Sequence, residues 1–333
     1  MEKKTNCYIA GTGHYLPETK LTNADLEKMM ETTDEWITQM VGIKERHIVG
    51  KSGEVTSDLA AKAGLRAIED AGLTPEDIQL IIVGTVTHDM MFPSTAIFVQ
   101  NKIGAKNAAA FDISAACTGF IYGLTMANGM IASSGYDNIL VIGVEYLTSL
   151  INWEDRGTAV LFGDGAGAVV LKKSNEENNH RGLLGSYIKS DGSLAELLWS
   201  VGGGTYVTSD KCTEEDKRAI IRMQGNKVYK YAVRAMIESA EEAMKNAGVT
   251  EKDIDILIPH QANMRIIDAI AKRVNLPEEK VLKNLPYTGN TSAASIPIVL
   301  DQAIKRGEIK KGDNVLIAAF GAGFTWGGAV IKI

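Results

Sequence analysis

The chain contains two copies of one sequence pattern, and this repeat limits the folds that it can adopt. The stretch AGLTPEDIQLII at residues 71–82 is answered by AGVTEKDIDILI at residues 247–258, 176 residues later. At the same offset, DNILVI at 137–142 is answered by DNVLIA at 313–318. Two matches in register indicate a duplicated structural unit rather than two unrelated similarities.

Each copy follows the same order of predicted elements. An amphipathic helix, at residues 57–71 in the first copy and 226–247 in the second, precedes an apolar strand, a further helix and a second apolar strand. Alternating helices and buried strands predict mostly parallel sheets that are covered on both faces. Each copy then ends in a glycine-rich stretch that we interpret as a hairpin, LFGDGAGAVVL at 161–171 and AAFGAGFTWGGAVI at 318–331.

These features predict two similar α/β halves, residues 1–175 and 176–333. The boundary between them falls in KKSNEENNHR, at residues 172–181, which is the most polar stretch of the chain. In duplicated folds a ligand site commonly lies between the halves, at the carboxyl ends of their strands. No GxGxxG motif follows a strand and opens a helix, so GDGAGA at 163–168 favours a turn over a phosphate-binding loop.

Charge and cysteine content argue against several classes of protein. The net charge of −6 gives no overall attraction for nucleic acid or an anionic membrane, so an anionic partner must meet a local basic patch. The N-terminus lacks the apolar core of a signal peptide, and no stretch approaches the roughly 20 apolar residues of a membrane helix, so we expect a cytoplasmic protein. The three cysteines, Cys7, Cys117 and Cys212, form no CxxC pair, which argues against a disulfide framework or a thiolate metal site.

Cys117, in DISAACTG at 112–119, lies where an apolar strand gives way to a helix. The apolar residues that follow it recur with the spacing of a buried helix face. A cysteine among alanines can simply be a small buried hydrophobe. At a helix N-terminus, however, the macrodipole favours an anion by up to about 2 kcal/mol, which would lower the pKa of a nucleophilic thiol. Because that effect is small, a nucleophile here would need a donor or a base nearby.

Two polar residues of the second half could supply that group. His260, in PHQAN, follows the apolar run IDILI and therefore stands at the carboxyl end of a strand; the alternative is a hydrogen-bonded histidine beneath a loop. Asn290, in YTGNTSAAS, precedes a predicted helix and could instead be an N-cap or turn residue. The remaining histidines lie in polar or loop-like contexts that do not suggest catalysis: His14, His47, His88 and His180.

Together, DISAACTG, PHQANMRII, GNTSAAS and FGAGFTWG resemble the β-ketoacyl-acyl carrier protein synthase III family, condensing enzymes with the thiolase fold. The resemblance extends over nearly the whole chain, from TNADLEKMMETTDEWI at 22–37 through FPSTA at 92–96 to the C-terminal strands. It implies two duplicated α/β halves in a five-layered αβαβα sandwich, which agrees with the repeat. It also implies a catalytic Cys-His-Asn triad at Cys117, His260 and Asn290.

The resemblance implies a ping-pong Claisen condensation that starts a fatty acid chain. Cys117 would take the acyl group of an acyl-CoA primer, while backbone N–H groups of Cys117 and Ala322 hold the oxyanion. His260 and Asn290 would then donate hydrogen bonds to the thioester carbonyl of malonyl-acyl carrier protein as carbon dioxide leaves. No metal or cofactor is required, since acyl-CoA is a substrate. The family also implies a homodimer.

Binding residues follow from the same resemblance. Trp36 and Arg156 match the pair that the family uses to sandwich the adenine of CoA, a stacking role suited to an indole and a guanidinium. Asn226 and Asn263 match further CoA contacts. Phe92 matches a pocket residue that helps to set the length of the acyl primer and reaches the partner subunit's site.

One position departs from the family. Between Trp36 and Gly42 the family often has an arginine that can reach the phosphates of CoA, and here that position is Met40. One charge-assisted contact to CoA is therefore absent, so the sequence leaves open whether CoA or carrier protein delivers the primer.

Four basic residues form a patch that the acidic net charge does not predict. Arg265, Lys272 and Arg273 lie on one predicted amphipathic helix, and Lys230 lies near the start of another, where a cation opposes the macrodipole. A solvated charged face is the ordinary interpretation of such a pattern. With the resemblance, we expect these residues to dock an acidic acyl carrier protein.

Other functions are compatible with the same sequence. A relative in the superfamily could prime a polyketide or alkylquinolone or transfer the acyl group to another acceptor, with divergence expected at Met40 and in GGGTYVTSDKCTEED at 202–216. A non-catalytic partner subunit could keep the fold, but it would have no need of a reactive thiol. Thiolase itself uses a second cysteine as its base, and Cys7 and Cys212 lie outside the glycine-rich site loops.

Overall fold

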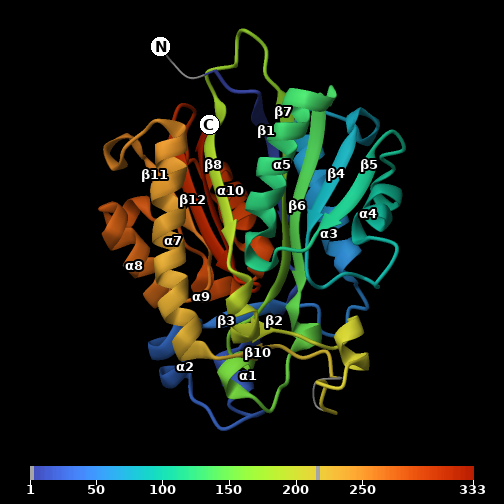
Figure 1. Cartoon of the computed structure of the whole chain (residues 1–333), viewed down its shortest axis with the longest axis vertical. Coiled ribbons are helices and arrows are strands. Elements are labelled where there is room, and N and C mark those ends of the chain that lie inside the picture. The colour runs from blue at the N-terminus through green and yellow to red at the C-terminus, as the bar shows by residue number, and fades with distance from the viewer. Residues whose placement is uncertain (1–3, 215–217) are drawn as a thin grey trace.

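The computed structural model describes residues 4–214 and 218–333, whose strands form two main sheets (Figure 1). The first sheet has the order β1–β7–β6–β4–β5, and the second has the order β11–β12–β13–β8. Their strands are β1 (Cys7–Tyr15), β4 (Leu80–Gly84), β5 (Ala109–Ile113), β6 (Asn138–Tyr146), β7 (Asp164–Lys173), β8 (Gly182–Ser190), β11 (Ile256–Pro259), β12 (Asn314–Gly321) and β13 (Thr325–Lys332).

Helices form three layers around the two sheets. α3 and α4 cover the outer face of the first sheet, and α7 and α8 cover the outer face of the second (Figure 1). α5 and α10 pack against strands of both sheets and fill the space between them. The predicted five-layered αβαβα sandwich is therefore confirmed. These helices are α3 (Thr56–Asp70), α4 (Thr95–Ile103), α5 (Gly119–Ser134), α7 (Gly225–Ala247), α8 (Met264–Val274) and α10 (Ser295–Lys305).

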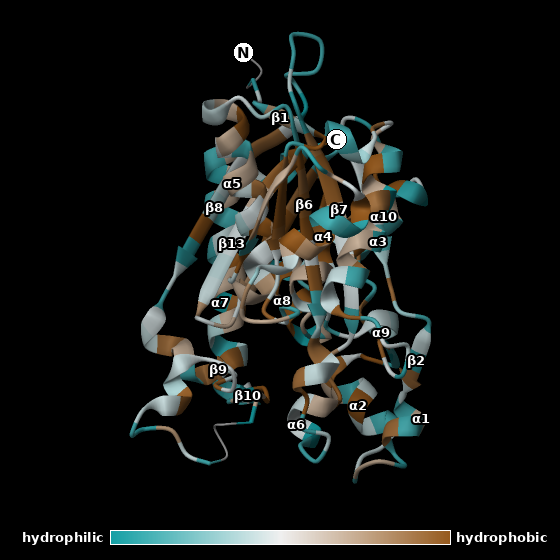
Figure 2. Ribbon diagram, turned by 90° about the vertical axis from the view of Figure 1, so that its right-hand side faces the viewer, coloured by the Kyte–Doolittle hydropathy of each residue, from teal (hydrophilic) through white to brown (hydrophobic). Residues whose placement is uncertain are grey.

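Shorter elements lie beyond one end of the sheets, the lower end in Figures 1 and 2. They connect the strands of the two halves rather than extend either sheet. They are β2 (Thr19–Thr22), α1 (Asn23–Leu26), α2 (Asp34–Val41), β3 (Glu45–Ile48), α6 (Arg156–Ala159), β9 (Leu198–Trp199), β10 (Arg222–Met223) and α9 (Leu285–Thr288).

The repeated sequence motifs contact one another within each half. In the first half, Asp77 caps a short turn before β4, and the side-chain amide of Asn138 donates to the carbonyl of Asp77 at 3.1 Å. In the second half, Asp253 and Asn314 make the same two contacts, the amide at 2.8 Å. The two motifs recur together because they form one hydrogen-bonded unit at the start of the paired parallel strands.

Two details of the predicted halves are wrong. The sheets are mixed rather than mostly parallel, because only β4 with β5 and β6, and β11 with β12, run in parallel. Residues 161–171 form no hairpin, since a long connection that includes α6 joins β6 to β7. Their glycines instead allow close packing: a Cβ at Gly167 would lie 2.7 Å from the backbone nitrogen of Ile298 in α10. The second predicted hairpin, β12–β13, is confirmed.

A shared apolar core joins the two halves. Buried side chains of α5, such as Phe120 and Leu124, belong to the same cluster as Ile296 and Leu300 of α10 and strand residues of both sheets. Figure 2 shows the strands β6 and β7 as apolar ribbons enclosed by these helices. Burial of this surface stabilises the halves against one another. Among the helices of the described ranges, none has the length and apolar character that a membrane crossing requires.

Candidate active site

Cys117 lies in a tight turn between β5 and α5. A short 3-10 turn covers Ala116–Thr118, and α5 begins at Gly119. Ala116 has a φ of +45°, a left-handed conformation that alanine rarely adopts, so the backbone bends sharply just before the cysteine. The residue is 9% exposed. The predicted junction of strand and helix is therefore present, with the strained residue Ala116 directly before the cysteine.

The turn between β12 and β13 packs against this cysteine from the second half. A Cβ at Gly321 would lie 2.8 Å from the backbone nitrogen of Cys117, so a side chain at this position would displace one of the two backbones. Thr325 Oγ1 lies 2.8 Å from Thr118 Oγ1, which fixes the two turns side by side. Ala322 directly follows Gly321 in the turn that packs against Cys117.

His260 is fully buried at the carboxyl end of β11 and is neutral, since burial lowers its pKa to about 3. Its Nδ1 lies 2.7 Å from Ser295 Oγ, and the same oxygen accepts the backbone N–H of Gln261 at 3.4 Å. We assign the hydroxyl proton to the bond with Nδ1, which places the imidazole proton on Nε2. That buried Nε2 has no hydrogen-bond partner within the described part of the chain, so it is free to donate to a ligand.

Asn290 is 7% exposed in the loop between α9 and α10. Its Oδ1 accepts the backbone N–H of Ser292 at 2.8 Å, so it serves the turn, as one interpretation of the sequence expected. Because this bond engages the amide oxygen, the Nδ2 amino group is the part of the side chain that can donate to a ligand. The two interpretations of Asn290 are therefore compatible.

Two residues next to Cys117 were missed by the sequence analysis. The Ser292 hydroxyl contacts the sulfur of Cys117 and donates to Oε1 of Glu145 at 3.1 Å. Glu145 is fully buried near the end of β6, and its Oε2 accepts the Thr87 hydroxyl at 2.6 Å. Burial raises the pKa of Glu145 to about 7. The sequence signal was an acidic residue at the end of the apolar run 139–144.

The thiol of Cys117 has a raised pKa, about 12, because burial disfavours the thiolate. Contact with the Ser292 hydroxyl lowers the pKa, and the negative charge of Glu145 raises it. The expected net lowering by the helix N-terminus is therefore wrong. α5 begins only at Gly119, and desolvation of a buried anion outweighs the modest field of a helix end.

The comparisons with known proteins match both halves of the chain. Residues 111–192 match the family described as 3-oxoacyl-[acyl-carrier-protein (ACP)] synthase III, and residues 244–333 match its C-terminal counterpart. Over 332 residues, the whole chain is 53% identical to 99% of the β-ketoacyl-[acyl-carrier-protein] synthase III of Caldanaerobacter subterraneus subsp. tengcongensis. The chain belongs to the β-ketoacyl-[acyl-carrier-protein] synthase III family.

Solved structures of related condensing enzymes share this fold. The enzyme of Aquifex aeolicus VF5 is 47% identical with a TM-score of 0.89, over 98% of this chain and 100% of that one. The enzyme of Thermus thermophilus is 41% identical with a TM-score of 0.91, over 98% and 99% of the two chains. The priming β-ketosynthase of the R1128 polyketide pathway is 33% identical with a TM-score of 0.91, over 100% and 98%.

In this chain, the residues expected to stack on the adenine of CoA already contact each other. The guanidinium carbon of Arg156 lies 5.2 Å from the ring centroid of Trp36, and the same guanidinium donates to the carbonyl of Glu31 at 2.9 Å. α2 and α6, which bear these side chains, lie at the lower end of the molecule (Figure 2). An inserted base would have to separate the two side chains. Asn226 is exposed at the start of α7.

A cation lies beside Met40 although the expected arginine is absent. The Arg265 guanidinium donates to the carbonyl of Gln39 at 3.3 Å and lies 3.8 Å from the sulfur of Met40. Asn263 caps α8, and its amide donates to the carbonyl of Met40 at 3.3 Å. The start of α8 and the end of α2 therefore form one polar surface.

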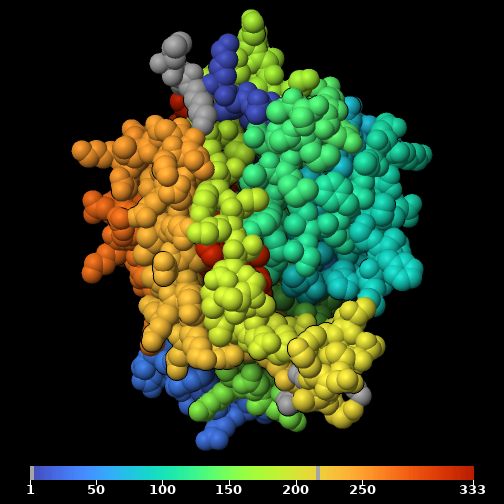
Figure 3. Space-filling view, in the orientation of Figure 1, coloured from blue at the N-terminus to red at the C-terminus, as the bar shows by residue number. Residues whose placement is uncertain are grey.

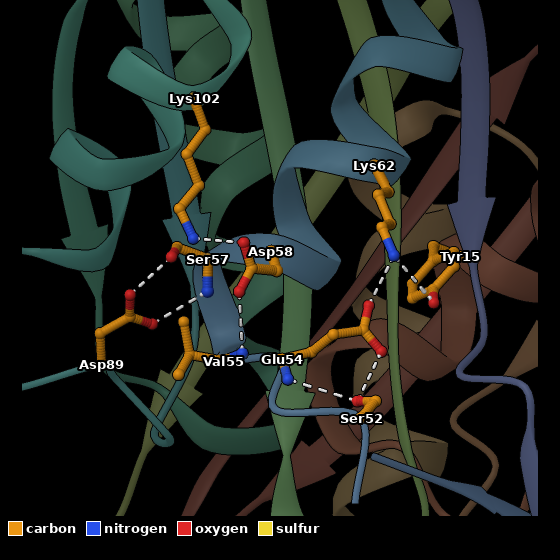
Figure 4. Close-up of polar contacts among 9 residues, drawn as sticks. All are labelled: Tyr15, Ser52, Glu54, Val55, Ser57, Asp58, Lys62, Asp89 and Lys102. Atoms are coloured by element: carbon orange, nitrogen blue, oxygen red, sulfur yellow. Dashed lines mark hydrogen bonds and ion pairs between the residues drawn. The ribbon is translucent and has the colours of Figure 1, made fainter.

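Phe92 is 83% exposed in the loop between β4 and α4. The base of this loop is fixed, because the Asp89 carboxylate accepts the backbone N–H of Ser57 at 2.9 Å and its hydroxyl at 2.5 Å (Figure 4). The neighbouring ion pair of Lys102 with Asp58 joins α4 to α3 in the same view. The loop thus holds an exposed aromatic side chain on a fixed base.

The other predicted positions lie on the surface. The four basic residues are exposed on the packed helices α7 and α8, and one of them is paired, Arg273 with Glu241. Residues 202–214 lie at the lower end of the molecule (yellow in Figure 3), and residues 215–216 of the same motif lie outside the described ranges. Cys212 is partly exposed in this segment, away from the buried turns at Cys117.

Proposed function

We propose that this protein is a β-ketoacyl-[acyl-carrier-protein] synthase III that condenses an acyl-CoA primer with malonyl-acyl carrier protein and so begins a fatty acid chain in the cytoplasm. The observation that carries the proposal is identity of 53% along the whole chain with a protein of that name. The contact of Cys117 with Ser292, two residues from Asn290, supports the chemistry.

The first half-reaction uses the turn at Cys117. The thiolate attacks the thioester carbonyl of the primer, an acyl-cysteine forms and CoA leaves. Backbone N–H groups of Cys117 and Ala322 hold the developing oxyanion. The absence of a side chain at Gly321, next to the backbone nitrogen of Cys117, supports this assignment because it lets the two N–H groups converge.

The second half-reaction uses the two side chains of the other half. The Nε2–H of His260 and the Nδ2–H of Asn290 donate to the thioester carbonyl of malonyl-acyl carrier protein as carbon dioxide leaves. The enolate carbon then bonds to the acyl carbon, the bond of that carbon to Cys117 breaks and leaves the electron pair on sulfur, and a β-ketoacyl thioester of the carrier protein is released. Neutral donors suit this step, because they stabilise the negative charge that develops on the enolate oxygen. The lowered pKa of His260 supports a neutral imidazole.

The function is tested by intact-protein mass spectrometry after incubation with acyl-CoAs from acetyl to decanoyl and isobutyryl. We expect one acyl adduct on the wild type and none on Cys117→Ala. Cys212→Ala is the matched control, because it removes a partly exposed thiol outside the site and should leave the adduct unchanged. If no acyl-CoA gives an adduct, the CoA-primed function is wrong and acyl carrier protein donors are to be tried.

A polyketide-priming role is the second candidate. It is favoured by the similarity to the R1128 priming β-ketosynthase and by Met40 in place of an arginine. The same panel separates the two functions, since the mass of the preferred adduct names the primer. If malonyl-acyl carrier protein of the fatty acid pathway extends that adduct, the fatty acid function is supported over polyketide priming.

The basic patch on α7 and α8 supports docking of an acidic carrier protein at Lys230, Arg265, Lys272 and Arg273. We expect Arg265→Glu to raise the KM for malonyl-acyl carrier protein about 10-fold, because it replaces an attractive charge with a repulsive one. Lys310→Glu makes the same charge change on another exposed surface and should have no such effect. Steady-state kinetics with both variants measure the difference. An unchanged KM for Arg265→Glu would count against docking here.

We also propose that two copies pair along β5. This strand is one of the two edges of the first sheet, the other being β1, and an unpaired edge favours association with another strand. Large exposed apolar side chains lie close to it in the sequence and support burial of this face: Met90, Met91, Phe92 and Ile97.

A further inference from the structure

A path of polar contacts leads from Cys117 through Ser292 to a buried carboxylate. Ser292 contacts the cysteine sulfur and donates to Oε1 of Glu145 at 3.1 Å. Oε2 of Glu145 accepts from the Thr87 hydroxyl at 2.6 Å and from the Val86 backbone N–H at 3.2 Å. A carboxylate at this depth is expensive to bury, and the mechanism described above does not use it.

Three features of the structure fix the position of Ser292. Its φ of +49° is a left-handed conformation that L residues seldom adopt. Its backbone N–H is fixed by Oδ1 of Asn290. The neighbouring carbonyl of Ala293 packs onto β6 so closely that a Cβ at Gly143 would lie 2.2 Å from its oxygen. Because Gly143 and Glu145 are two residues apart on β6, they face the same side of the sheet, toward this turn.

We propose that Ser292 relays the proton of Cys117 to Glu145 as the thiolate attacks the acyl donor. The S–H bond of Cys117 breaks and its proton goes to Ser292 Oγ, while the hydroxyl proton of Ser292 goes to Oε1 of Glu145. The sulfur electron pair bonds to the acyl carbon. The departing CoA thiolate then takes a proton back, which leaves Glu145 a carboxylate. A hydroxyl has one proton and two acceptor sites, so reversing its two hydrogen bonds completes the transfer.

The relay is favoured because it avoids placing two negative charges in a desolvated site. If the proton were lost to solvent, the thiolate and the Glu145 carboxylate would both be buried anions, whereas the relay keeps one negative charge throughout. The other groups bonded to Glu145 are hydroxyls and backbone amides, so Cys117 is the titratable group joined to it, and His260 is neutral. The raised pKa of Glu145, about 7, makes it a suitable acceptor near neutral pH.

The relay rests on the proposed function, and its test separates the two. Formation of the acyl-cysteine is followed by rapid quench and mass spectrometry from pH 5 to 9, in the wild type, Glu145→Gln and Ser292→Ala. Alkylation of Cys117 by iodoacetamide, which needs no acyl donor, is measured in parallel. Asp164→Asn is the matched control, because it neutralises another fully buried carboxylate, one bonded to Thr148 and Val49.

With a relay, both variants acylate about 100-fold more slowly at pH 8, and Asp164→Asn does not. The wild-type rate falls below about pH 7, where Glu145 becomes protonated, and Glu145→Gln lacks this fall. If Glu145 were only a buried anion that opposes the thiolate, Glu145→Gln would acylate as fast as the wild type or faster, and the relay would be overturned. If the two variants acylate as fast as the wild type, the relay is wrong but the proposed function is unaffected. If no protein is acylated but iodoacetamide alkylates Cys117 more slowly in the variants than in the wild type, the proposed function is wrong but the relay is supported.

Thermal unfolding separates these effects from loss of the fold. Because the folded-state pKa of Glu145 is raised from 4.5 to about 7, its contribution to stability is present below pH 4.5 and lost as the pH rises through 7. Glu145→Gln is therefore expected to have a higher Tm than the wild type at pH 8 and no such advantage at pH 5. A variant that is more stable and yet acylates more slowly cannot owe the lower rate to unfolding.

Discussion

Replacement of His260 by alanine is expected to slow decarboxylative condensation about 10²–10³-fold while acylation of Cys117 persists. The variant loses a neutral N–H donor from a fully buried position, where a hydrogen bond to a developing enolate is worth far more than in water. The structure gives Nε2 this role, because Ser295 engages Nδ1 and Nε2 is buried without a partner among the described residues.

The measurement is a single turnover of pre-acylated protein with malonyl-acyl carrier protein, in which the rate of carbon dioxide release is recorded. His47→Ala is the control, because His47 lies in β3, where its ring bonds to the carbonyl of Pro17. Since the pKa of His260 is about 3, its protonation should not slow condensation at pH 5 or above. Equal loss of acylation and condensation would show instead that His260 acts as the base for Cys117.

Gly143→Ala is expected to destabilise the protein by about 3 kcal/mol and to reduce both half-reactions. The new Cβ would lie 2.2 Å from the carbonyl oxygen and 2.7 Å from the carbonyl carbon of Ala293, which are backbone atoms. These atoms of Ala293 cannot move without shifting the preceding residue, Ser292, whose backbone N–H is hydrogen-bonded to Asn290. A single methyl group would therefore disturb the core and the site together.

Gly129→Ala provides the matched control for Gly143→Ala. Gly129 lies inside α5, and a Cβ there would meet no atom within 4 Å. Alanine in a helix interior is more favourable than glycine, so this variant should gain up to about 1 kcal/mol. Urea denaturation of both variants gives the comparison. If Gly143→Ala proves as stable as the wild type, the turn at Ser292 packs less tightly on β6 than the structure indicates.

Much of the fold followed from the sequence because its signals are local. The repeat predicted two similar halves, and the capped turns at Asp77 and Asp253 show that the repeated residues meet within each half. The direction of strand pairing did not follow, because an apolar run buried in a sheet has the same composition in parallel and antiparallel pairs. The glycines of 161–171 were misinterpreted for a related reason, since the backbone that requires them, at Ile298, is distant in the sequence.

The candidate site, like the fold, was predicted from the sequence only in part. The sequence by itself pointed to three candidate side chains, Cys117, His260 and Asn290, through their places at the ends of predicted strands and helices and through the resemblance of their motifs to the synthase III family. Only the tertiary structure decided the protonation of those groups and the partners of the thiol. The pKa values of Cys117, His260 and Glu145 depend on desolvation by both halves, and the Cys117–Ser292–Glu145 path joins three distant segments. Burial is a property of packing, so no local pattern specifies it.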